Sequence, residues 1–162
     1  LLHGDKNIIK MLNEGKCKEE IIRLLSDINY YSYDEVMKNF ELTINELRHR
    51  EAQLNVSVTD FIVSNYQDKY LFYTINHPAF YISRYVAQEI LKLLNINQNE
   101  IESVVIDDFM NHLHIPIYPR VIHHLGLKFN KPDHKYSFYY YLDKRRVTFE
   151  EYLSEYIDHA IS

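Results

Sequence analysis

The sequence predicts a helix-dominated α/β fold with about six helices and one or two short strands of the parallel type. Its 162 residues include three glycines and four prolines, too few for the many tight turns of a β-sandwich or barrel. Apolar residues recur mostly at steps of three and four, the spacing of a helix with one buried face. Hydrophobic residues make up 46% and charged residues 25%, as in ordinary globular chains.

We expect residues 1–162 to form a single domain or the C-terminal fragment of a larger α/β domain. No repeat, low-complexity tract or Gly/Ser linker interrupts the sequence. Leu1 to Gly4 include no initiator methionine and do not resemble a signal peptide, so we expect the sequence to begin inside a longer protein. No apolar stretch approaches the roughly 20 residues that cross a bilayer, which predicts a protein without a membrane span.

The first elements are expected to be helices. Residues 5–14 and 18–27 carry Ile and Leu at helical spacing on either side of Gly15, which predicts a helical hairpin. A longer helix should run from about Tyr33 to Leu54 with Asp34 as its N-terminal cap. Residues 57–60 (Ser-Val-Thr-Asp) should begin a short fourth helix.

The segment Leu71 to Pro78 (LFYTINHP) is the most informative part of the sequence. Residues 70–75 are β-favouring and almost all apolar, as in a parallel strand that is buried on both faces. Pro78 disfavours helix at His77 but suits the first turn of the next helix, expected from about Ala79 to Leu94 and packed on the sheet. Asn76 and His77 are thus predicted to lie at a strand-to-helix junction, where ligands bind in open α/β sheets.

The C-terminal third predicts further short elements. Residues 100–110 read as a helix or, over 103–106, as a second strand, and both alternatives stay open. Pro116 and Pro119 make the segment between them extended or turning. A short helix should follow over residues 119–125, and residues 148–151 (Thr-Phe-Glu-Glu) should begin the last helix.

Charge and cysteine content narrow the classes of partner. The net charge is −5 and no basic block is present, which argues against nucleic acid as a partner. The single cysteine, Cys17, cannot form an internal disulfide, and we expect a cytoplasmic, reducing location. The fifteen tyrosines favour packing or an interface, such as that of a homo-oligomer, over a stacking site for a carbohydrate or nucleotide.

His77 is the best single candidate for chemistry, because imidazole titrates near neutrality and acts as a general acid or base. Asn76 would orient it or donate a hydrogen bond to an oxyanion. The competing interpretation is an Asn-His-Pro turn that merely ends a strand. A metal site is not predicted, because the set Asp107, Asp108, His112, His114, His123 and His124 matches no metal-binding spacing.

Three stretches of the sequence together resemble one family. They are Leu47 to Glu51 (LRHRE) followed by Val58 to Ile62 (VTDFI), then the LFYTINHP segment, then Ile115 to Pro119 (IPIYP) with Leu125 to Leu127 (LGL). Their order, and the helix expected after Asn-His-Pro, resemble the C-terminal half of the WcbI-type polysaccharide biosynthesis proteins over roughly residues 8–160.

The resemblance implies both a fold and an activity. Proteins of that family are similar in fold to SGNH-type hydrolases, bind coenzyme A and are implicated in acetyl transfer during capsular polysaccharide synthesis. It therefore implies an acyltransferase that uses coenzyme A or acetyl-CoA and a sugar or polysaccharide precursor, with His77 as general base. Arg50, Glu51 and Asp60 are the substrate- or cofactor-binding residues that the resemblance suggests.

One departure from the family pattern keeps a second hypothesis open. The family's Gly-Asn-Cys-Gln segment, which opens its α/β domain, has no counterpart here, and Cys17 lies in a different context. The alternative is a non-catalytic helical module for protein interaction or glycan binding that uses the tyrosine-rich surface. The two hypotheses differ in whether His77 performs acid–base chemistry.

Overall fold

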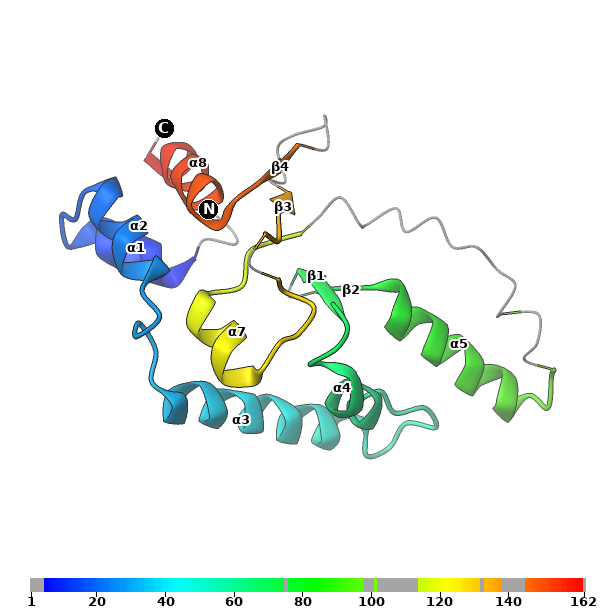
Figure 1. Cartoon of the computed structure of the whole chain (residues 1–162). Coiled ribbons are helices and arrows are strands. Elements are labelled where there is room, and N and C mark those ends of the chain that lie inside the picture. The colour runs from blue at the N-terminus through cyan, green and yellow to red at the C-terminus, as the bar shows by residue number, and fades with distance from the viewer. Residues whose placement is uncertain are drawn as a thin grey trace.

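The computed structural model describes residues 5–74, 76–97, 101, 114–131, 133–137 and 145–161. In these ranges the chain forms seven helices and four short strands (Figure 1). The helices are α1 (Lys6–Asn13), α2 (Lys18–Ser26), α3 (Tyr33–Glu51), α4 (Thr59–Asn65), α5 (Phe80–Leu93), α7 (Pro119–Leu125) and α8 (Phe149–Ile161). The strands are β1 (Phe72–Thr74), β2 (His77–Pro78), β3 (Tyr136–Ser137) and β4 (Arg146–Val147). The prediction of a helix-dominated α/β fold is confirmed.

The predicted helical hairpin, α1 and α2, packs against the last helix, α8 (Figure 1). Asp5 begins α1, because its carboxylate accepts hydrogen bonds from the backbone N–H groups of Asn7 and Ile8. The side chains buried between the three helices are Ile8, Met11, Ile21, Leu25, Leu153 and Ile157. The first and last helices of the chain therefore share one hydrophobic core.

The long helix α3 begins at a different cap from the predicted one. Ser32, not Asp34, is the N-cap: its hydroxyl accepts from the backbone N–H of Glu35, and the Glu35 carboxylate accepts from the Ser32 N–H. This reciprocal pair satisfies two helix-end donors, which one carboxylate at position 34 would not do. The helix ends at Glu51, three residues before the predicted Leu54.

A second core joins α3 to α4, β1 and α5. Its buried residues are Ile44, Ile62, Leu71 and Ile82. Ile44, Ile62 and Ile82 come from α3, α4 and α5, and Leu71 is the residue before β1. This core lies directly beside the hairpin that carries His77.

The prediction of parallel-type strands is wrong. β1 pairs with β2 in antiparallel register, with Phe72 opposite Pro78 and Thr74 opposite His77, and β3 pairs with β4 in the same manner. The chain reverses at Asn76 instead of crossing over to a distant strand, so the hairpin satisfies its backbone groups locally. Phe72 is 41% exposed, so the strand is not buried on both faces.

The other edge of β1 is covered by the proline-containing segment. The backbone N–H of Ile115 donates to the carbonyl of Tyr73 at 3.2 Å. The carbonyl of His114 in turn accepts from the N–H of Ser137 at 3.0 Å. Residues 114–118 contain no helix, as the two prolines predicted, and this extended segment connects the two small sheets.

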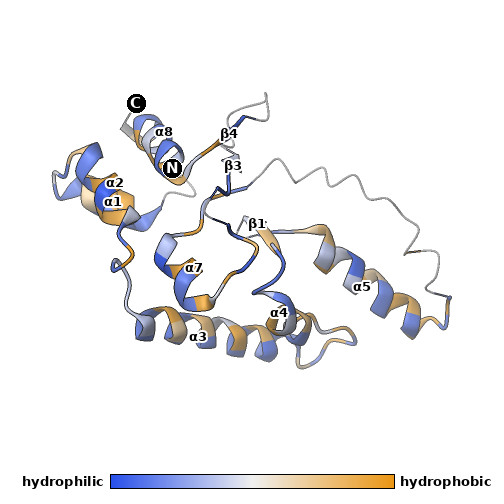
Figure 2. Ribbon diagram, viewed as in Figure 1, coloured by the Kyte–Doolittle hydropathy of each residue, from blue (hydrophilic) through white to orange (hydrophobic). Residues whose placement is uncertain are grey.

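Helix α5 was predicted to pack on the sheet, but it does so only over its first turns. Ile82 is buried, but Leu94 at the far end is 61% exposed. Figure 2 shows apolar residues continuing to the end of this helix, which extends away from the rest of the fold. Packing is limited to its first turns because the strands beside it are only two and three residues long. The predicted alternatives for residues 103–106 lie outside the described residues.

The short helix predicted over residues 119–125 is confirmed as α7, with Pro119 in its first turn. It ends at Gly126, whose φ of 63° is left-handed and suits a residue without a β-carbon. The amide of Gln67 donates to the carbonyl of Leu125 at 3.0 Å. This bond fixes the end of α7 to the loop between α4 and β1. No helix in the described ranges is both long and apolar enough to cross a membrane.

Candidate functional site

His77 is held by a threonine on the neighbouring strand. The Nδ1 atom of His77 lies 2.5 Å from Oγ1 of Thr74, its partner in the hairpin register. Thr74 Oγ1 also donates to Oδ1 of Asn76 at 2.9 Å and accepts from the backbone N–H of Asn76 at 3.4 Å. Asn76 and His77, both predicted from sequence, are therefore brought together by Thr74, which was not predicted.

The bond between Thr74 and Asn76 matches one of the two tautomers of His77. A threonine hydroxyl has one proton to donate, and Thr74 directs it to Asn76. When that proton goes to Asn76, the same oxygen is an acceptor toward His77, which corresponds to the tautomer with the proton on Nδ1 and the lone pair on Nε2. The imidazole is half-buried, and no residue in the described ranges hydrogen-bonds to Nε2. The contact with Thr74 fixes the position of the imidazole.

Glu51 contacts the start of α4. Its carboxylate accepts hydrogen bonds from the hydroxyl groups of Ser57 and Thr59, each at 2.5 Å, and from the backbone N–H groups of Val58 and Thr59. Partial burial raises the pKa of Glu51, but these hydrogen bonds outweigh it and lower the pKa overall. Val58, the N-cap of α4, makes no side-chain cap, so Glu51 performs this role from the preceding helix.

Arg50 and Asp60 form separate exposed ion pairs. The Nε atom of Arg50 lies 2.7 Å from Oε1 of Glu46 one turn earlier in α3. Asp60, 88% exposed, lies 3.4 Å from Arg48. Arg48, Arg50 and Glu51 thus have three different partners, as expected of residues on different sides of one helix.

The five predicted site residues fall into two groups in the structure. Asn76 and His77 belong to the β1–β2 hairpin, whereas Arg50, Glu51 and Asp60 lie where α3 meets α4. In the part of the chain that the structure describes, no hydrogen bond or ion pair joins the two groups. A substrate that contacts both would have to bridge the first turns of α4 and the hairpin.

A stack of aromatic rings joins Tyr70 and Tyr73 to two histidines. The ring of His114 stacks on Tyr70 at 4.6 Å and on Tyr73 at 4.8 Å, and His134 lies 6.0 Å from His114. Burial, with Arg146 and His134 nearby, lowers the pKa of His114 to about 4. His114 is thus a neutral core residue. No group of three or more potential metal ligands occurs in the described ranges, while Asp107, Asp108 and His112 lie outside them.

The tyrosine cluster near residue 30 packs with the proline-containing segment. Tyr30 and Tyr31 lie 6.0 and 5.7 Å from the ring of Tyr118. The hydroxyl of Tyr118 donates to Asp5 at 2.6 Å, and that of Tyr31 accepts from Asn7 at 2.7 Å. Because these hydroxyl groups bind the start of α1, the cluster serves internal packing instead of a stacking platform for a ligand. Three further tyrosines, at residues 139–141, lie outside the described residues.

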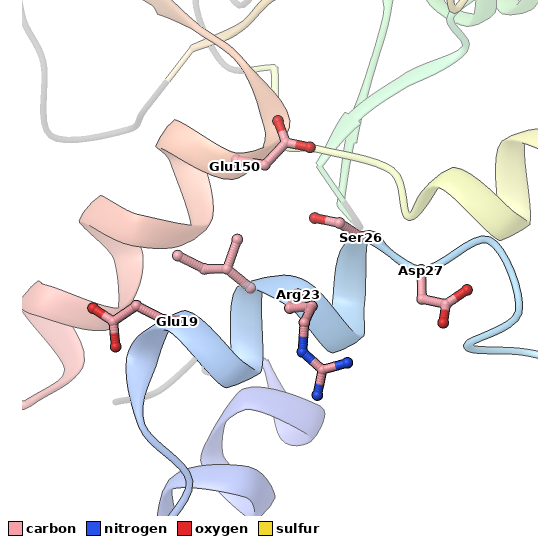
Figure 3. A pocket seen from close by; sticks show the side chains of 6 residues that line it. Glu19, Arg23, Ser26, Asp27 and Glu150 are labelled. Atoms are coloured by element: carbon pink, nitrogen blue, oxygen red, sulfur yellow. The ribbon is translucent and has the colours of Figure 1, made fainter.

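A hollow of about 590 Å³ lies between α2 and the start of α8 and not near His77. Its lining residues are Glu19, Ile22, Arg23, Ser26, Asp27 and Glu150. Figure 3 shows the charged ends of Arg23 and Glu150 pointing away from each other, so they do not form a converging polar site. A smaller apolar cavity of about 180 Å³ lies beside Phe72, next to the hairpin.

Fold and site define a helix-dominated α/β protein with an oriented histidine on a short hairpin. The family described as "Polysaccharide biosynthesis enzyme WcbI" matches residues 3–99, which is more than half of the chain. The chain belongs to this family and therefore has a role in polysaccharide biosynthesis. No curated protein and no solved structure matches it. All five predicted site residues lie in the matched range, whereas residues 115–127 lie beyond it.

Proposed function

We propose that this protein takes part in coenzyme A-dependent acyl transfer to a sugar hydroxyl of a capsular or surface polysaccharide, or of its precursor, in the cytoplasm. The observation that carries the proposal is the Thr74–His77 contact, which fixes the imidazole and leaves its Nε2 without a hydrogen-bond partner among the described residues. Membership of a polysaccharide biosynthesis family supplies the class of acceptor. The acetyl group is the acyl group that the family resemblance favours.

In the proposed reaction, Nε2 of His77 takes the proton of the sugar hydroxyl as its oxygen attacks the thioester carbonyl carbon. The carbon–sulfur bond then breaks, and the leaving thiolate of coenzyme A takes the proton back from His77. Asn76 assists through its side-chain amide, whose oxygen is engaged by Thr74 and whose N–H₂ group is directed to the developing oxyanion. General base catalysis of this kind contributes roughly 10²- to 10⁴-fold in rate.

Arg50 is the proposed partner of a coenzyme A phosphate. Its side chain is 72% exposed and pairs with Glu46, and exposed pairs of this kind contribute only about 0–1 kcal/mol. Exchanging Glu46 for a phosphate would therefore cost little. Asp60 offers an exposed carboxylate to sugar hydroxyls. Glu51 is assigned a supporting role, because its oxygens already accept four hydrogen bonds from the start of α4.

The test is acetyl transfer from acetyl-CoA to a sugar acceptor by the complete protein, measured by release of the free thiol. His77→Gln should lower turnover by about 10²- to 10⁴-fold with an unchanged far-UV circular dichroism spectrum. The matched control is His49→Gln, since His49 is exposed on α3 and should retain full turnover. Equal turnover of the two variants would remove His77 from the mechanism.

A further inference from the structure

The apolar cavity beside the hairpin is lined by side chains from distant parts of the chain. Phe40, Ile62 and Phe72 line it from α3, α4 and β1, and Leu127 and Phe129 line it from the segment after α7. Its volume is about 180 Å³. An apolar cavity of roughly 150 Å³ stays dry and binds a molecule as large as benzene, so this one accommodates about six carbon atoms. Because the lining residue Phe72 is also exposed, the cavity is reached from the surface there.

Lys69 is the charged residue at this cavity. Its Nζ donates to Oδ1 of Asn65 at 2.6 Å and lies 5.5 Å from the ring centres of Phe61 and Tyr81. No carboxylate in the described ranges forms an ion pair with it, whereas the neighbouring Lys128 pairs with Asp68 at 3.0 Å. A half-buried lysine that lines an apolar cavity suits a ligand with an apolar tail and an oxygen-bearing head.

The cavity also adjoins the oriented histidine. Phe72 pairs with Pro78 and Thr74 pairs with His77, so the lining ring and the imidazole belong to adjacent residue pairs of one hairpin. Two residues along a strand span about 6.6 Å. A chain buried in the cavity would therefore have its head group, at the surface opening, next to the proposed base.

We infer that this cavity binds a short acyl chain of up to about six carbons, with its carbonyl or carboxylate oxygen at Lys69. The inference rests on the proposed acyl transfer for its biological meaning and on the cavity and the lysine for its chemistry. The cavity volume would then limit the length of the acyl chain: acetyl to hexanoyl groups fit, and longer chains do not. The head group would be the thioester carbonyl of the acyl donor.

Binding of straight-chain carboxylates to the complete protein tests this inference directly. Acetate, butyrate, hexanoate and decanoate are titrated by calorimetry and by NMR of the protein amides. Each added methylene should raise the affinity about fourfold up to hexanoate, and decanoate should bind no more tightly than hexanoate. A complete lack of binding, or an affinity that continues to rise through decanoate, would overturn the inference.

Two variants locate the binding. Leu127→Phe should fill the cavity and weaken hexanoate at least tenfold, with Leu125→Met as the volume-conserving control. Lys69→Met should weaken hexanoate about tenfold and leave hexanol unchanged, with the exposed Lys10→Met as the charge control. If both test variants bind hexanoate as tightly as the wild type, hexanoate adsorbs to the surface and the cavity is not its binding site. Specific binding by a protein without acyl transfer would retain the cavity and reject the proposed enzyme activity.

Discussion

Glu51 and Thr59 form the contact that joins the two helices of the predicted binding region. The Glu51 carboxylate at the end of α3 accepts from both the hydroxyl and the backbone N–H of Thr59, the first residue of α4. Thr59 is 1% exposed, so its hydroxyl has little access to water as an alternative partner. This contact therefore helps to fix α4 against α3, together with the core contact of Ile44 and Ile62.

We predict that Glu51→Gln destabilises the protein by about 2 kcal/mol, because an amide cannot accept four hydrogen bonds with the strength of a carboxylate. Urea unfolding followed by circular dichroism measures the change. Glu46→Gln is the control: Glu46 pairs with Arg50 at the surface, and its loss should leave the free energy of unfolding nearly unchanged. Equal destabilisation by the two changes would contradict the capping role of Glu51.

The pH dependence of this contribution has a definite sign. The pKa of Glu51 in the folded protein lies below its ordinary value, so the carboxylate contributes stability at pH values above the unfolded pKa of about 4.3. That contribution is lost as the pH falls through the folded pKa. The stability difference between wild type and Glu51→Gln should therefore shrink in acid, and a constant difference down to pH 2 would contradict this assignment.

Thr74 is predicted to be a positioning residue. Thr74→Val removes the oxygen that binds Nδ1 of His77 while keeping the shape of the side chain, whereas Thr74→Ser keeps the oxygen. In the acyl-transfer assay we expect Thr74→Val to lower kcat about 10- to 100-fold and to shift the pH–rate profile, with Thr74→Ser close to wild type. Loss of activity in both variants, or in neither, would argue against tautomer control by Thr74.

The elements that could be predicted from sequence are those whose signals are local. α7 and the start of α8 follow from Pro119 in a first turn and from the reciprocal bonds of Thr148 and Glu151. The Ser-Tyr-Asp-Glu sequence at residues 32–35 contained the signal for the true cap of α3. The signals for such elements lie within three or four residues of one another, so they can be read from a single sequence.

The features that could not be predicted depend on tertiary contacts. A run of apolar residues at 70–75 suits a parallel strand, and only the return of the chain at Asn76 makes it half of a hairpin. Within the site, Asn76 and His77 were found because their chemistry is distinctive, but Thr74 was missed because an isolated threonine in a strand is common. The capping role of Glu51 was missed because its partners are six to eight residues away, in another helix.

Tyr118→Phe should cost about 1.5–3 kcal/mol, the usual contribution of a hydrogen bond to a charged group. Its hydroxyl donates to Asp5 at 2.6 Å, and burial raises the pKa of Tyr118, so the neutral donor is the stable form. Tyr33→Phe is the control, because Tyr33 is 54% exposed and should change stability by under about 0.5 kcal/mol. Similar unfolding midpoints for the two variants would contradict a structural role for the Tyr118–Asp5 bond.

His114 should make the protein less stable as the pH falls from about 6.5 to about 4. Burial lowers the pKa of His114 to about 4 in the folded protein, while the unfolded chain titrates near 6.5. Between these values the unfolded state binds more protons, so this residue alone lowers the free energy of unfolding by up to about 1.4 kcal/mol per pH unit.

His114→Phe preserves a ring between Tyr70 and Tyr73 and should remove this part of the pH dependence, whereas His49→Gln on the exposed face of α3 should not. Urea unfolding at pH 7, 6 and 5 measures both slopes, and a His114→Phe slope equal to that of wild type would show that His114 titrates normally in the folded protein.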